Sequence, residues 1–284
     1  MSAYYKVNRN PEWNYGGKNF RLSRSKIDLF LDCARCFYVD NKLGIARPPG
    51  FPFNLNNAVD ELLKKEFDVH RANGSQHPLA KEYGVDAVPM KHPKIDEWRD
   101  ALKAGVSTNH KATGLIVRGG IDDVWVRPDG ELIVVDYKAK SKNERIEELD
   151  QEWHIGYKRQ MEVYQWLFRQ NNFRVSNTGY FVYANASKDK EAFDAKLEFE
   201  VTLVPYTGDD SWVEGVLIDL KKCLDNPEAP APSKECDYCR YREAAGRALL
   251  AIHPQTKRPV LDSKKLATKN DEKDDSKTKP LFQV

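Results

Sequence analysis

Two aspartates and a lysine lie in a stretch whose pattern predicts a β-hairpin. Asp122 belongs to a first β-rich run, and Asp136 and Lys138 follow the apolar run at residues 132–135. The Arg-Pro-Asp-Gly sequence at residues 127–130 is a turn that would join the two runs and bring Asp122 towards Asp136. Because side chains alternate along a strand, Lys138 projects from the same face as Asp136. Two carboxylates and an ammonium group at the end of a sheet suit a divalent metal that activates water against a phosphodiester.

Three further residues extend this predicted site. The Tyr137 carbonyl is available as another metal oxygen beside Asp136. Gln160 and Tyr164 lie one turn apart on a predicted long helix, so their side chains share a face. We expect Gln160 to orient Lys138 or the attacking water, and Tyr164 to contact the substrate or to buttress the helix.

Four of the five cysteines form two Cys-x-x-Cys pairs at opposite ends of the chain. Such pairs supply the four thiolates of a zinc or an iron–sulfur site. One alternative is that all four act as small buried hydrophobic residues. A redox dithiol is a third possibility, but it requires a thioredoxin-like sequence context, which is absent here. The cysteines that we predict to share a site are Cys33, Cys36, Cys236 and Cys239, whereas core packing is expected for Cys223.

The hairpin resembles the catalytic motif of the PD-(D/E)XK nuclease superfamily, and specifically its RecB-like branch. A Gly-x-Ile-Asp strand that ends at Asp122 is followed by an apolar strand and Asp-Tyr-Lys, and Gln160 and Tyr164 fit the Gln-x-x-x-Tyr motif of that branch. The resemblance implies a DNA nuclease that depends on Mg²⁺ or Mn²⁺, with Asp122 and Asp136 as metal ligands. It also implies an α/β fold with an αβββαβ core around a central mixed sheet. An ordinary hairpin whose Asp and Lys reach into solvent is the alternative.

The same resemblance bears on Asp60. In the family, a helix before the sheet carries a Gly-x-x-(Val/Ile)-His motif whose histidine binds the metal. Residues 56–60 match that helix with Asp60 at the histidine position, and a carboxylate is a harder donor for Mg²⁺ than an imidazole. An exposed helical carboxylate is the competing interpretation.

The cysteine pattern is similar to that of iron–sulfur nucleases of the CRISPR-adaptation and AddB types. There, one cysteine before the nuclease core joins three after it. Cys33 matches the first ligand, and Cys236 and Cys239 match two of the last three. The final cysteine of the family is missing, because residues 244 and 245 are alanines, and Cys36 is the candidate for the fourth thiolate. This departure leaves both an iron–sulfur cluster and zinc open.

Composition predicts a soluble chain but does not indicate what the chain binds, so a binding surface must come from local clusters of residues. The 284 residues carry 31% charged side chains and a net charge of +2, so overall charge does not indicate a nucleic-acid surface. No apolar run reaches the length of a membrane span, and the first residues lack the apolar core of a signal peptide, so we expect a cytoplasmic protein. No phosphate-binding Gly-x-x-x-x-Gly-Lys loop occurs, so unwinding of DNA would need a helicase or another repair or CRISPR-adaptation partner.

Periodicity and composition divide the chain into four parts. The order helix, three strands, helix and strand over residues 54–183 matches the αβββαβ core. The predicted parts are an N-terminal arm with a cysteine-bearing helix (1–53), the nuclease core with an insertion near 71–105 (54–225), a C-terminal cysteine segment and helix (226–253), and a disordered tail (254–284).

A second function class fits the same features. A non-catalytic DNA-binding or scaffold module could keep the fold and the structural metal after losing the chemistry. We favour the nuclease because Asp122, Asp136, Lys138 and Gln160 are all present, whereas a decayed site usually loses at least one such residue.

Overall fold

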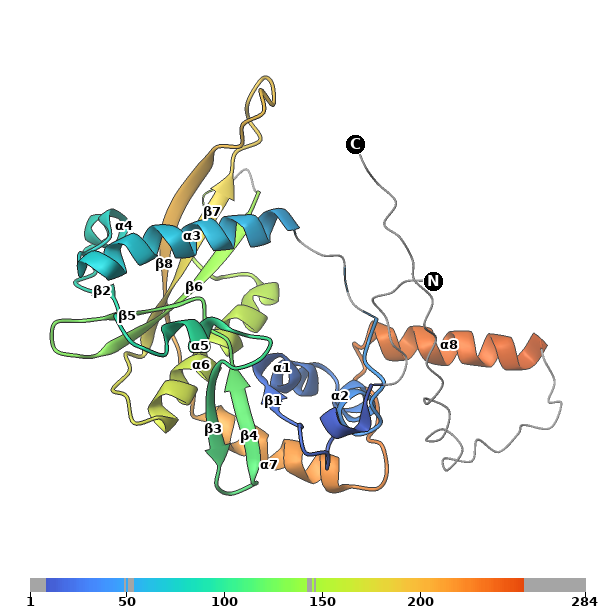
Figure 1. The fold of residues 1–284 in the computed structure, drawn as a ribbon. Coiled ribbons are helices and arrows are strands. Elements are labelled where there is room, and N and C mark those ends of the chain that lie inside the picture. Colours follow the sequence, from blue (N-terminus) through green and yellow to red (C-terminus); the bar gives the residue numbers. More distant parts are fainter. Residues whose placement is uncertain (1–8, 49, 51–53, 142–144, 146, 253–284) are drawn as a thin grey trace, which may run out of the picture. The chain divides into compact units, whose positions relative to one another are not determined.

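A five-stranded mixed sheet forms the centre of the protein (Figure 1). This computed structural model describes residues 9–48, 50, 54–141, 145 and 147–252. Two of the central strands pair in parallel, and the other neighbours are antiparallel. In sheet order the strands are β2 (Val88–Pro89), β5 (Asp123–Val126), β6 (Leu132–Lys140), β7 (Thr178–Ala186) and β8 (Phe199–Thr207), with β6 and β7 as the parallel pair.

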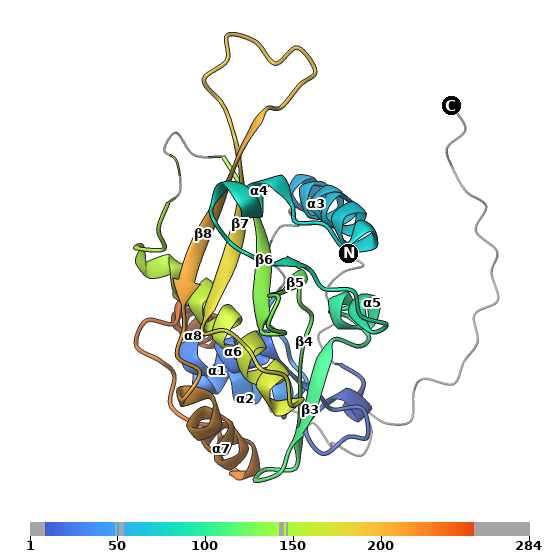
Figure 2. The ribbon, with the colours of Figure 1, turned by 90° about the vertical axis from the view of Figure 1, so that its left-hand side faces the viewer.

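Strand β6 is buried on both of its faces, as its apolar sequence predicts. Val134 packs in one core cluster with residues of helix α6 (Ile155–Gln170). Ile133 and Val135 pack in a second cluster with residues of helix α3 (Asn54–Asn73). The two helices therefore cover opposite faces of the sheet (Figure 2). This arrangement confirms the predicted α/β fold with a central mixed sheet.

The predicted hairpin corresponds to β5 and β6. Asp123 pairs with Val135 in the antiparallel ladder, which fixes Asp122 and Asp136 at the same end of the two strands. Gly130 has φ +81° in the turn, a conformation that glycine adopts without steric cost. Because β6 and β7 are parallel, the chain must cross over between them, and α6 provides that crossover.

A separate three-stranded sheet in the order β1-β4-β3 precedes the hairpin. Its strands are β1 (Leu22–Ser23), β3 (Val106–His110) and β4 (Leu115–Gly119). The sequence predicts β4 but not β3, since β3 reads Val-Ser-Thr-Asn-His and carries almost no apolar alternation. Gly119 at the end of β4 allows close packing, because a Cβ atom there would lie only 2.6 Å from the Tyr164 ring.

The first cysteine lies at a break between two short helices. The sequence predicts one helix from Ser23 or Ser25 to near Gly44, whereas the structure has α1 (Arg24–Asp32) and α2 (Ala34–Asn41). Cys33 between them is extended, with φ −161° and ψ 104°. An extended residue stops the helical ladder, so the prediction of a continuous helix is wrong at this point.

Shorter elements and the C-terminal part complete the chain. The stretch at 71–105 contains α4 (Pro78–Glu82), β2 and α5 (Ile95–Arg99), and β2 pairs with β5 as an edge strand of the main sheet. The remaining elements are two 3₁₀ turns, η1 (Pro11–Trp13) and η2 (Glu152–His154), and helices α7 (Trp212–Asp225) and α8 (Asp237–Ile252).

Contacts divide the chain into two units, residues 1–238 and residues 239–284. The first contains both sheets, and the second begins within α8. The tail predicted for residues 254–284 lies outside the described residues. Across the part of the chain that the structure describes, none of the helices has the length and apolar character to cross a membrane.

Candidate active site and cysteine cluster

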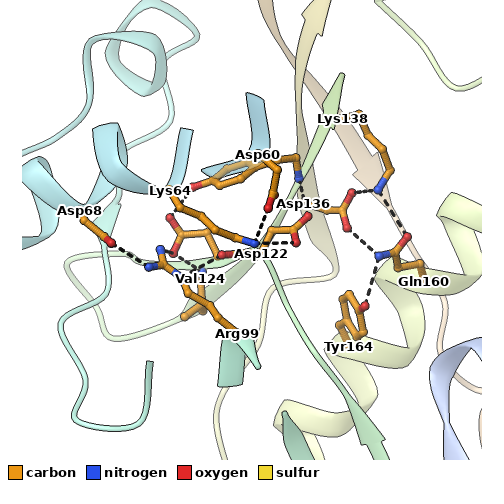
Figure 3. Close-up of polar contacts among 12 residues, drawn as sticks. Asp60, Lys64, Asp68, Arg99, Asp122, Val124, Asp136, Lys138, Gln160 and Tyr164 are labelled. Atoms are coloured by element: carbon orange, nitrogen blue, oxygen red, sulfur yellow. Dashed lines mark hydrogen bonds and ion pairs between the residues drawn. The ribbon is translucent and has the colours of Figure 1, made fainter. Parts of the chain in front are cut away.

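Asp122 and Asp136 meet at the end of the β5–β6 hairpin (Figure 3). Asp122 directly precedes β5, and its Oδ2 accepts a hydrogen bond from the Tyr137 backbone N–H at 2.8 Å. Asp136 lies on β6 with no exposed surface. The hairpin register thus holds one carboxylate close to the strand that carries the other.

A chain of polar contacts joins Asp136 to helix α6 (Figure 3). The Lys138 ammonium donates to Asp136 Oδ2, and Gln160 Nε2 donates to Asp136 Oδ1 at 2.8 Å. Gln160 also lies 3.4 Å from Lys138 Nζ through its Oε1 and 3.2 Å from the Tyr164 hydroxyl. The structure therefore brings together the residues predicted on β6 and those predicted one turn apart on α6.

Asp60 lies on helix α3 and reaches the same site through a lysine that no motif indicated (Figure 3). Lys64 Nζ lies 2.7 Å from Asp60 Oδ2 and 3.6 Å from Asp122 Oδ1. The i, i+4 spacing places Lys64 on the helix face of Asp60, which is the signal that could have predicted its position. Lys64 thus bridges the helix carboxylate to the hairpin carboxylate.

Asp60, Asp122, Lys138 and Gln160 line a cavity with a volume of about 440 Å³. Arg24 from the first turn of α1 also contributes to its wall, although no sequence motif indicated this residue. Its wall also includes Asn56 and Tyr157. The cavity therefore has acidic groups from α3 and from the residue that precedes β5, and basic groups from α1 and β6.

Burial and mutual repulsion make the carboxylates of this site costly to ionise. Burial raises the pKa of Asp136 to about 7, and the negative charge of Asp122 adds to the rise while Lys138 opposes it. Burial and the Asp122 charge likewise raise the pKa of Asp60 above its usual value. Burial alone would lower the pKa of Lys138, yet the Asp136 and Asp122 charges raise it, so this lysine is a cation at neutral pH.

The residue types at this site suit a hard divalent cation, although within the described residues only the four cysteines bring three or more ligand atoms within 4.8 Å of one another. Asp60, Asp122 and Asp136 supply carboxylate oxygens, the ligands that Mg²⁺ and Mn²⁺ prefer. The raised pKa values of Asp60 and Asp136 are an unfavourable electrostatic feature that a cation would relieve. Tyr137 lines the same cavity beside Asp136, although its hydroxyl points to the opposite side of the sheet.

Asp123 turns away from the cavity, as strand alternation predicts, into a buried ion cluster. Arg71 Nη2 lies 2.5 Å from Asp123 Oδ1, and the Tyr137 hydroxyl donates to Asp123 Oδ2 at 2.7 Å. Arg99 lies 3.3 Å from Asp123 Oδ1 and donates from Nε to the Asp122 carbonyl oxygen at 3.0 Å. The cluster thereby fixes the backbone that carries Asp122, a support role that sequence reasoning missed.

The four predicted cysteines gather in one place. The Sγ atoms of Cys33, Cys36, Cys236 and Cys239 all lie within 4.8 Å of one another, and all four side chains are buried. Cys36 Sγ and Cys236 Sγ are 3.6 Å apart. Four converging thiols are the donor set of a zinc site or an iron–sulfur cluster, so the residues fit either group. Cys223 does not belong to this group and packs, partly buried, against the main core.

Positive and N–H groups face the sulfur atoms. Arg47 Nη2 lies 3.4 Å from Cys236 Sγ, and the Ser233 backbone N–H lies 3.5 Å from Cys33 Sγ. Such donors stabilise the thiolate form, which is the form that binds metal. The contacts therefore support a metal-binding role over four inert thiols.

Comparison with known proteins relates the chain to one family. The family model described as "PD-(D/E)XK nuclease superfamily" matches residues 21–244. No curated protein matches the chain. Among solved structures, the chain titled "Crystal structure of SSO0001" is similar over 48% of the present chain, with 18% sequence identity and a TM-score of 0.26. That similarity spans 54% of the other protein's own chain.

Proposed function

The chain belongs to the PD-(D/E)XK nuclease superfamily, and from this premise we propose that it is a metal-dependent deoxyribonuclease that hydrolyses phosphodiester bonds. The observation that carries the proposal is a cavity lined by Asp122 and Lys138, in which Lys138 also contacts the buried Asp136 carboxylate. Both signs of charge are needed to position a phosphodiester and a water molecule together, and this cavity has both.

Asp122 and Asp136 are the proposed ligands of Mg²⁺ or Mn²⁺, with Asp60 and the Tyr137 carbonyl as further oxygens. When bound, the cation would lower the pKa of a water molecule and neutralise charge on the phosphate. The support for Asp60 is its bridge through Lys64 to Asp122. The support for Asp136 is its burial, since an ionised carboxylate without a bound cation is costly there.

Lys138 would hold the attacking water and stabilise the negative charge that develops on the phosphate. Gln160 contacts both Lys138 and Asp136, so it is suited to fix the direction in which the ammonium points. The Tyr164 hydroxyl accepts a hydrogen bond from Gln160 Nε2 and the Tyr164 ring packs against Gly119, so Tyr164 would support Gln160 in turn. Each of these contacts restricts a side chain before the substrate arrives.

For the cysteine cluster we propose an iron–sulfur cluster, with zinc as the alternative. The support is the resemblance of Cys33, Cys236 and Cys239 to the ligands of iron–sulfur nucleases, together with the convergence of the four sulfur atoms. Protein purified without oxygen should then be brown with broad visible absorbance, whereas a colourless protein with stoichiometric zinc would select the alternative.

DNA repair, recombination or CRISPR adaptation in the cytoplasm is the proposed setting, with a helicase or adaptation protein as partner. This proposal rests on the resemblance of the motifs alone. The non-catalytic DNA-binding or scaffold module is the competing function, and cleavage assays separate the two.

The experiment is cleavage of single- and double-stranded DNA with Mg²⁺ or Mn²⁺, comparing wild type with Asp136→Ala and Lys138→Ala. We expect each substitution to abolish cleavage, because one removes a metal oxygen and the other a charge needed in the transition state. Lys111→Ala, the same change in an exposed turn, serves as the control and should retain activity. Full activity in either active-site variant would favour the binding module.

A further inference from the structure

A second groove adjoins the active-site cavity. Its volume is about 690 Å³, which is in the range of pockets that hold small ligands. It shares part of its wall with the cavity that contains Asp122 and Lys138, so the two spaces are neighbours. The shared lining residues are Asn56, Val59, Ala139 and Tyr157.

The outer wall of the groove consists of large apolar side chains that remain exposed. Leu55 on the first turn of α3 is 61% exposed, and Leu197 and Phe199 on or next to β8 are 39% and 36% exposed. Exposed apolar side chains that line a groove, unlike isolated ones, commonly mark a binding surface. Figure 2 shows the connection between β7 and β8 extending beyond the rest of the sheet on the side where α3 begins.

The inner wall combines an aromatic ring with positive charge. Tyr157 on α6 has the Lys138 ammonium 4.6 Å and the Lys140 ammonium 5.0 Å from its ring centroid. Lys138 lies in the active-site cavity, whereas Lys140 lines the groove. The two lysines therefore place positive charge in both neighbouring spaces, and positive charge attracts the phosphates of a nucleic-acid strand.

We propose that this groove binds the base of a nucleotide next to the scissile phosphate of an unpaired DNA strand. Exposed apolar and aromatic side chains beside a track of positive charge are the features with which proteins hold unpaired bases. A base inside a duplex is stacked and paired, so it must leave the helix before it can enter a side groove. The inference rests on the proposed nuclease function and adds to it the form of the substrate.

The test uses oligothymidylate strands that carry one abasic residue, placed at successive positions along the strand. In wild type, cleavage with Mg²⁺ should fall about tenfold when the abasic residue occupies the groove, since one base–side-chain stack is lost. Phe199→Ala and Leu55→Ala should cleave the intact strand more slowly by a similar factor and should no longer distinguish the abasic strand. Both residues are exposed, and thermal unfolding checks that the variants are folded.

Phe193→Ala is the matched control, because Phe193 lies on the connection that leads into β8, is 74% exposed and is outside the groove. It should keep the abasic penalty of wild type. If Phe199→Ala and Leu55→Ala keep the wild-type penalty for the abasic strand, the proposed base-binding role of the groove is wrong. The proposed nuclease function is unaffected by that result.

Binding of the same fluorescent strands with Ca²⁺ separates the two proposals. Wild type could fail to cleave any strand and still bind the abasic strand more weakly at one position, with this difference lost in Phe199→Ala. That result would overturn the proposed nuclease function and support the proposed base-binding groove. Equal binding of intact and abasic strands by wild type at every position would overturn the groove.

Discussion

Lys64 introduces a positive charge between two carboxylates that are proposed to bind a metal. Its Nζ contacts Asp60 at 2.7 Å and Asp122 at 3.6 Å, and both partners are partly buried. The Asp122 and Asp60 charges raise the pKa of Lys64 despite its burial, so it remains protonated at neutral pH. A cation that shares oxygens with a metal ion weakens the binding of that ion by repulsion.

We therefore predict that Lys64→Met binds Mn²⁺ more tightly than wild type. The expected gain is about fivefold, which corresponds to roughly 1 kcal/mol for one partly exposed ion pair. Lys65→Met, a change at the adjacent exposed lysine, should leave the affinity unaltered. Titration calorimetry measures both, and weaker Mn²⁺ binding by Lys64→Met would show that the lysine supports the ligands instead of competing.

Asp136 should make stability depend on pH when no divalent cation is present. Its pKa rises from 3.8 in the unfolded chain to about 7 in the folded protein, so the folded state holds the extra proton between these values. The contribution of this group to stability is greatest below pH 3.8 and is lost as pH rises to about 7. The free energy of unfolding should fall by up to about 1.4 kcal/mol per pH unit over this interval.

Asp136→Asn removes this titrating group. Its free energy of unfolding should therefore lack the part of the pH dependence that Asp136 contributes. The measurement is urea unfolding of both proteins at several pH values with no divalent cation added. Parallel stability curves for wild type and Asp136→Asn would show that Asp136 is ionised throughout, held by Lys138.

The residues that the sequence predicted are those whose placement follows from local periodicity. Asp136 and Lys138 share a face because strands alternate, and Gln160 and Tyr164 share one because a helix repeats within four residues. Arg24 lines the cavity and Lys64 contacts Asp122 from helices that are far from the hairpin in sequence. Their approach depends on tertiary packing, which local periodicity does not contain.

Helix α3, α5 and the hairpin are joined by the buried cluster around Asp123. Arg71 comes from α3 and Arg99 from α5, and both also bind Asp68, so three elements share one set of charges. Asp123 has no exposed surface. Its removal would leave two guanidinium groups buried with less compensation than they have now.

We predict that Asp123→Ala lowers the free energy of unfolding by about 3–5 kcal/mol, the usual cost of breaking a buried ion pair. Asp96→Ala, an exposed aspartate on α5, should change it by less than about 0.5 kcal/mol. Urea unfolding measures both. Equal stabilities of the two variants would mean that Asp68 alone balances the arginines.

Elements with strong apolar periodicity were predictable, and those defined by their neighbours were not. Strand β6 has a continuous apolar run, whereas β3 is a strand only because β4 pairs with it. The break at Cys33 interrupts a pattern that looks helical throughout. Local propensity cannot anticipate such a break, because the residues on either side of Cys33 continue the same apolar pattern.

For the molecule as a whole, the cysteine cluster closes a very long loop. Cys36 and Cys236 are separated by 200 residues yet lie 3.6 Å apart. Nearby, Arg35 donates to the Pro230 carbonyl at 2.8 Å, and Tyr38 donates to the Pro227 carbonyl at 2.9 Å. A metal centre at this point would restrict the unfolded chain and stabilise the fold.

Cys36→Ser should therefore lower the midpoint of thermal unfolding by at least about 5 °C, with loss of bound metal. Cys223→Ser, the same change at a cysteine outside the cluster, should shift it by less than about 2 °C. Differential scanning calorimetry with elemental analysis checks both. If wild type and Cys36→Ser have equal unfolding midpoints and equal metal content, the cysteine cluster does not contribute to the stability of the protein.

The sequence separation of 200 positions from Cys36 to Cys236 also imposes an order on synthesis. A ribosome adds about 5–20 residues per second, so the second cysteine pair follows the first by roughly 10–40 s. By the end of that interval, the strands of both sheets and the proposed catalytic residues have been synthesised, before a four-thiolate site can be completed. Metal loading at the cysteines therefore comes after nuclease-core synthesis, and only a chain translated past Cys239 can acquire the full centre.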